Sequence, residues 1–71
     1  MTIEEITTRL KKLEGKDVEL VRKGRLKFTG ELDKYDPLLG AIVLRSWTDS
    51  LAAGIDVIKS VNVNKLTIYL K

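Results

Sequence analysis

The sequence predicts a mostly β domain, in which one N-terminal helix precedes five short strands that form a strongly bent antiparallel sheet, a small open barrel. Three observations predict this class. The apolar residues near the N-terminus recur at three- and four-residue steps, the period of a helix. Farther along, the apolar period changes to two, the period of a strand. Finally, a chain of 71 residues has room for a single domain, residues 1–71.

The composition, with 44% hydrophobic and 32% charged residues, is typical of a soluble globular protein. Cysteine and histidine are absent, so disulfides and the usual zinc ligands cannot stabilise so short a chain, and we expect oligomerisation to add burial. The formal net charge of +3 is mildly favourable for contact with a polyanion. No apolar run is long enough to cross a bilayer, and the acidic start Met1–Glu5 is unlike a secretion signal, so we expect a cytoplasmic protein without membrane partners.

The first element is a short amphipathic helix. Thr2 and Glu5 have the spacing of a reciprocal capping box at a helix start. Gly15 supplies a residue that stops the helix in a left-handed conformation. The apolar positions between them lie on one side of the helix, which we expect to cover an apolar surface: Ile3, Ile6, Leu10 and Leu13.

A hairpin follows, with Lys23-Gly24 at its turn. Val18 and Leu20 alternate with polar residues in its first strand. Its second strand is expected to present one continuous face: Leu26, Phe28, Gly30 and Leu32. We expect this strand to coil at Gly30, which lacks a Cβ. Beyond Leu32 the apolar parity slips by one residue, which predicts a bulge or a sharp bend.

The second half of the chain contains the remaining strands. Pro37 places residues 36–39 in a turn, and the continuous apolar run 41–44 predicts a strand covered on both faces. Residues 49–54 are weakly patterned and predict a loop, with one helical turn at 51–53 as the alternative. Strands are expected within 55–64 and over 66–71. The last strand has lysines only at its ends, so we expect its edge to pair with another copy, head to tail, in a closed ring.

The segment from Gly30 to Val43 carries a more specific pattern. Its order of glycine, leucine, aromatic residue and aspartate across a turn, at Gly30, Leu32, Tyr35 and Asp36, resembles the first signature of the Sm/LSm family. The resemblance implies a small SH3-like barrel that assembles into homo-oligomeric rings and binds single-stranded RNA at the pore. The same residues also fit a bent hairpin in another SH3-like barrel.

The nucleotide pocket that this resemblance implies departs from the family pattern. Leu38 and Gly40 occupy the positions where relatives stack a base and hydrogen-bond it through an asparagine. In the second signature, Asn62 and Val63, followed by Asn64, replace the usual arginine and glycine, and Lys59-Ser60 is the alternative register. The predicted nucleic-acid-binding residues of this atypical pocket are therefore Leu38, Gly40, Lys59, Asn62 and Asn64.

Other side chains leave two interpretations open. Four basic residues surround the first hairpin turn, where they either contact RNA phosphates or keep the turn soluble: Arg22, Lys23, Arg25 and Lys27. Trp47 and Tyr69 either stack nucleobases or pack at a subunit interface. Since histidine and cysteine are absent and no phosphate-cradling motif occurs, we expect no enzyme, no cofactor and no metal site.

The sequence thus predicts an Sm-like ring that binds single-stranded RNA. Two alternatives remain: a structural or protein-binding ring without base recognition, and a monomeric SH3-like adaptor resembling a ribosome-assembly domain.

Overall fold

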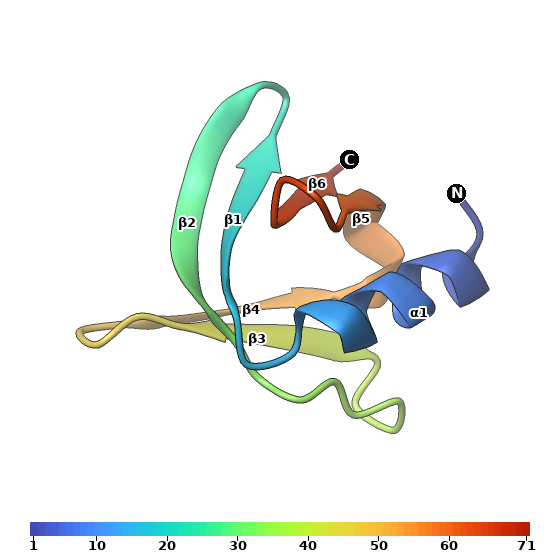
Figure 1. Ribbon diagram of the computed structural model, residues 1–71, viewed down its shortest axis with the longest axis horizontal. Coiled ribbons are helices and arrows are strands. Elements are labelled where there is room, and N and C mark those ends of the chain that lie inside the picture. The colour runs from blue at the N-terminus through green and yellow to red at the C-terminus, as the bar shows by residue number, and fades with distance from the viewer.

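The structure, a computed structural model, describes residues Met1–Lys71. It contains one α-helix, six strands in a single sheet and one short 3-10 helix (Figure 1). In chain order the elements are α1 (Ile3–Leu13), β1 (Asp17–Arg22), β2 (Arg25–Leu32), β3 (Ala41–Arg45), β4 (Ser50–Gly54), η1 (Ile55–Val57), β5 (Ile58–Asn62) and β6 (Thr67–Leu70). The helix is too short and too polar to span a membrane.

The helix begins at the predicted Thr2 cap and ends before Gly15, but the predicted capping box is not reciprocal, because the Glu5 carboxylate accepts from the Thr2 hydroxyl and not from its backbone N–H. The Glu5 backbone N–H donates to Thr2 Oγ1 at 3.2 Å, and the Thr2 hydroxyl donates to Glu5 Oε1 at 3.2 Å. Gly15 has a left-handed φ of 78° and donates its N–H to the Leu32 carbonyl at 2.8 Å, which joins the helix end to the sheet. Ile6, Leu10 and Leu13 are buried, but the prediction for Ile3 was wrong, because this side chain in the first turn of the helix is 63% exposed.

The sheet has the strand order β4-β3-β2-β1-β6-β5, so the prediction of five strands was wrong. The additional strand is β4, within the segment predicted to be a loop. Its small residues have little intrinsic strand preference, but they pair in register with β3 from Ala41↔Gly54 to Arg45↔Ser50. The sheet is also not wholly antiparallel, because β1 and β6 run parallel.

The predicted apolar face of β2 was wrong at Leu26. Leu20 faces Phe28 but Val21 faces Leu26, so a bulge at Lys27 turns Leu26 to the opposite face, where it is 59% exposed. Gly30 allows β2 and β3 to approach each other closely, since a Cβ there would lie 2.8 Å from the backbone carbonyl carbon and oxygen of Arg45.

The last strand is not a sheet edge, so the expected pairing through it was wrong. β6 lies inside the sheet, bonded to β1 on one side and to β5 on the other, while the edges are β4 and β5. Figure 1 shows β6 and β5 beside the β1–β2 hairpin and α1 close to β5.

The core lies between α1 and the inner face of this sheet. It is one cluster of 12 buried hydrophobic residues, with Leu10, Leu13, Leu32, Ile42, Leu44 and Ile68 fully inaccessible to solvent. Tyr35 belongs to it, so the aromatic position of the Gly30–Asp36 pattern has a structural role. Asp36 pairs with Ala41 and closes the loop between β2 and β3.

Candidate nucleic-acid interface

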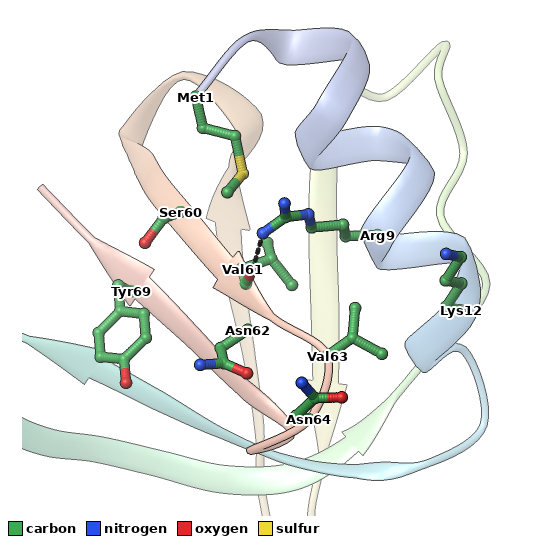
Figure 2. A pocket seen from close by; sticks show the side chains of 9 residues that line it. All are labelled: Met1, Arg9, Lys12, Ser60, Val61, Asn62, Val63, Asn64 and Tyr69. Atoms are coloured by element: carbon green, nitrogen blue, oxygen red, sulfur yellow. Dashed lines mark hydrogen bonds between the residues drawn. The ribbon is translucent and has the colours of Figure 1, made fainter.

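A polar hollow of about 540 Å³ lies between α1 and the β5–β6 hairpin (Figure 2). Arg9 and Lys12 reach it from the helix, Asn62 and Asn64 come from the hairpin, and Tyr69 comes from β6. These side chains supply cations, amides and an aromatic ring, the groups with which proteins contact phosphates and bases of single-stranded nucleic acid.

The two cations are held on one side of the helix, because residues three apart in an α-helix are neighbours. Arg9 Nη1 donates to the Val61 carbonyl at 2.9 Å, which fixes the guanidinium against β5 and leaves its other N–H groups available. Lys12 is exposed, and neither cation forms an ion pair.

The two asparagines have different roles. Asn62 Oδ1 accepts the Lys65 backbone N–H at 3.0 Å and so supports the turn, which leaves its NH₂ group as a donor. Asn64 is exposed and its amide makes no hydrogen bond within the protein. The hollow therefore presents one amide whose oxygen is partly used by the protein and one whose donor and acceptor groups are both free.

Tyr69 also belongs to a partly exposed apolar row that crosses three strands. Its register partner in β1 is Val21, and the partner of Val21 in β2 is Leu26, so the three side chains lie on one face of the sheet. At about 4.8 Å between strands, the row extends about 10 Å from Tyr69 to Leu26.

A second hollow, of about 490 Å³, lies at the β1–β2 turn, next in sequence to Val21 and Leu26, and is lined only by four basic residues: Arg22, Lys23, Arg25 and Lys27. Arg22 and Arg25 face each other across the strands, and Arg22 Nε donates to the Lys71 carbonyl at 3.1 Å. No aspartate or glutamate side chain pairs with any of them, since the one ion pair of the structure joins Arg45 and Asp33. The predicted basic cluster is thus a surface without acidic side-chain partners.

The five residues predicted as a nucleotide pocket do not come together. Asn62 and Asn64 share the first hollow, but Lys59, exposed at an irregularity between Ile58 and Ser60, does not line it. Leu38 and Gly40 lie in the β2–β3 loop and do not line it either.

The β2–β3 loop residues have local roles. The Leu38 N–H donates to Asp36 Oδ1 at 2.9 Å while its side chain is 95% exposed. Gly40 adopts a left-handed φ of 62°, and its carbonyl accepts the Ile55 N–H at 2.8 Å. A glycine at this position therefore serves the backbone.

Sequence analysis missed Arg9 and Lys12 as candidate binding residues. Their three-residue spacing was visible, but the surface that this side of the helix faces depends on how α1 docks on β5. Val21 was missed because it lies beside a bulge that strand periodicity does not reveal.

Comparison of the sequence with protein-family models finds no matching family, and comparisons with curated proteins and with solved structures find no significant match. The support for the candidate interface therefore comes from its own residues.

Proposed function

We propose that the protein binds single-stranded RNA along the surface that runs from the α1–β5–β6 hollow, over Tyr69, Val21 and Leu26, to the basic β1–β2 turn. The observation that carries this proposal is a set of six cations without acidic side-chain partners. Two of them line the hollow that Tyr69 also lines, and four surround the turn that joins the strands of Val21 and Leu26. Phosphates bind cations, and bases stack on aromatic rings.

Each part of the surface has a distinct task in this proposal. The guanidinium and ammonium groups hold the RNA backbone, a base stacks on Tyr69, and the free amide of Asn64 contacts a base edge or a ribose hydroxyl. Because few side chains are placed to distinguish bases, we expect sequence preference to be weak.

One carboxylate, that of Glu19, limits the path of the RNA across the sheet. The row next to Tyr69 contains Asn62, Thr67, Glu19 and Thr29 in register, and Glu19 is exposed. Its charge disfavours phosphate at the middle of the sheet and directs the chain toward the basic turn.

We further infer that the curved sheet belongs to the small Sm-like or SH3-like barrels, on the strength of the Gly30–Asp36 pattern. Assembly into a ring stays a prediction. The monomeric SH3-like adaptor is the second candidate, because β6 already has strand partners on both sides. Light scattering distinguishes them, since a stable ring has a mass several times that of the 8.0 kDa monomer.

RNA binding is tested by fluorescence anisotropy with labelled oligo-uridine and a mixed-sequence RNA at low and moderate salt. We expect both RNAs to bind, with affinity that falls as salt rises. Tyr69→Ala should weaken binding at least about fivefold through loss of stacking, whereas the matched control Tyr69→Phe keeps the ring and should bind like the native protein. Absence of binding at low salt would end the proposal.

A further inference from the structure

We propose that the free edge of β4 binds an extended segment of a partner protein by strand addition, and that this segment has small or apolar residues at its centre and a basic residue at each end. This site lies at the opposite edge of the sheet from β5 and does not depend on RNA binding.

The hydrogen-bond alternation of the β3–β4 hairpin shows which backbone groups face outward. The Ile55 N–H donates to the Gly40 carbonyl and the Ser46 N–H donates to the Asp49 carbonyl, each at 2.8 Å. In an antiparallel pair, bonded and non-bonded residue pairs alternate, so the N–H and C=O groups of Ala52 and the N–H of Gly54 point away from β3, while the Gly54 carbonyl begins η1. No side chain of the protein bonds to these groups, which leaves them free for another strand.

The β4 edge also lacks the usual protection against strand addition. The outward-facing positions Ser50, Ala52 and Gly54 are small and uncharged, and β4 contains neither proline nor lysine. The other edge of the sheet differs, because α1 packs on β5 and Arg9 donates to the Val61 carbonyl. Only one edge is therefore bare.

Charge at the two ends of β4 indicates what kind of strand fits. Asp49 precedes the strand and Asp56 follows it; both are exposed, and neither forms an ion pair. A second copy paired antiparallel would bring Asp49 of one chain close to Asp56 of the other, and a parallel copy would place identical aspartates together. Because like charges on paired strands destabilise the pair, the edge favours a different chain with lysine or arginine at both ends.

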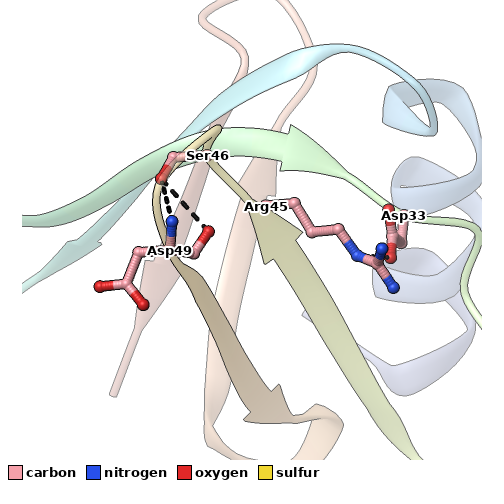
Figure 3. A network of polar contacts seen from close by, with 4 residues as sticks. All are labelled: Asp33, Arg45, Ser46 and Asp49. Atoms are coloured by element: carbon pink, nitrogen blue, oxygen red, sulfur yellow. Dashed lines mark hydrogen bonds and ion pairs between the residues drawn. The ribbon is translucent and has the colours of Figure 1, made fainter.

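Trp47 lies in the turn that leads into β4. It is 97% exposed. The turn is fixed by bonds between Ser46 and Asp49, in which the Asp49 N–H donates to Ser46 Oγ at 3.1 Å (Figure 3). The Ser50 N–H also donates to Asp49 Oδ1, at 2.9 Å. An exposed indole two residues before the Asp49 carboxylate can meet a basic side chain at this end of β4, which then gains a cation–π contact and an ion pair.

The probe for this site is a blocked heptapeptide of alternating valine and threonine with an arginine at each end. Trp47 is the only tryptophan, so its emission reports binding directly. We expect a saturable shift of Trp47 emission with the probe, and none with a peptide of the same centre that has glutamate at both ends.

Variants of the edge decide the mode of binding. Ala52→Pro removes an outward-facing N–H that forms no hydrogen bond with β3. It should therefore weaken binding of the probe at least about fivefold without unfolding the protein. Asp49→Asn with Asp56→Asn should weaken binding of the probe about threefold at low salt, whereas the control Glu4→Gln with Glu19→Gln, at exposed positions that do not share a hollow with Trp47, should not. No saturable shift, or equal affinity in Ala52→Pro, overturns the proposal. Self-association that Ala52→Pro abolishes overturns it too, because the occupant is then a second copy.

Discussion

Removing two cations from the β1–β2 turn tests whether this turn contacts phosphate. In Lys23→Ser with Arg25→Ser, both altered residues are exposed, and neither side chain forms a hydrogen bond or an ion pair, so the fold should persist. Loss of Arg25 also relieves its repulsion with Arg22, the cross-strand partner.

The size of the effect follows from the number of cations at the interface. If all six meet phosphates, counterion release from a single strand gives a slope of log affinity against log salt of about −4, and the double variant should show about −3. Between 50 and 200 mM salt, the native protein should then lose about 300-fold in affinity and the variant about 50-fold.

The assay is anisotropy of labelled oligo-uridine at four or more salt concentrations. The matched control is Lys11→Ser with Lys16→Ser, which removes the same charge from exposed positions outside both hollows and should keep the native slope. An unchanged slope in the turn variant, or the same decrease in both variants, would refute the assignment of phosphate contacts to the turn.

Three further predictions follow from particular contacts. Gly30→Ala places a Cβ 2.8 Å from the Arg45 backbone. We expect this contact to cost about 2 kcal/mol of stability, which lowers the melting temperature of this small domain by about 13 °C. An unchanged melting curve by circular dichroism would show that the strands do not approach so closely. Thr2→Ala removes the cap of α1 and should cost about 1 kcal/mol in urea unfolding, while Thr7→Ala, away from the cap, should cost less. Glu19→Gln should raise RNA affinity about twofold at low salt, and a decrease would place Glu19 among the binding groups.

The local sequence pattern was sufficient to predict the elements that are determined by residues close together in the sequence. The Thr2 cap, the apolar spacing through Leu13 and the left-handed Gly15 define the helix without reference to the rest of the chain. The turn at Lys23-Gly24 was predicted for the same reason, since both residues adopt a positive φ there.

Elements that depend on distant partners were not predictable in this way. The residues of β4 form a strand because β3 offers a ladder in register, and the bulge at Lys27 is set by how β1 and β2 pair. The interior place of β6 follows from sheet order, which strand periodicity does not encode. Asn62 and Asn64 could be predicted as candidate binding residues, because they precede the last strand in the sequence. Arg9 and Lys12 could not, because their place at the hollow depends on how α1 docks.

The central claim is that RNA lies along one defined surface, and its most direct test is a titration of the isotope-labelled protein with oligo-uridine, followed by backbone and side-chain amide chemical shifts. The account predicts the largest changes at Tyr69, at the Asn64 amide and around Arg22 and Arg25, with little change at Ala52. Changes centred on Leu38 and Gly40, or no changes at low salt, would contradict it.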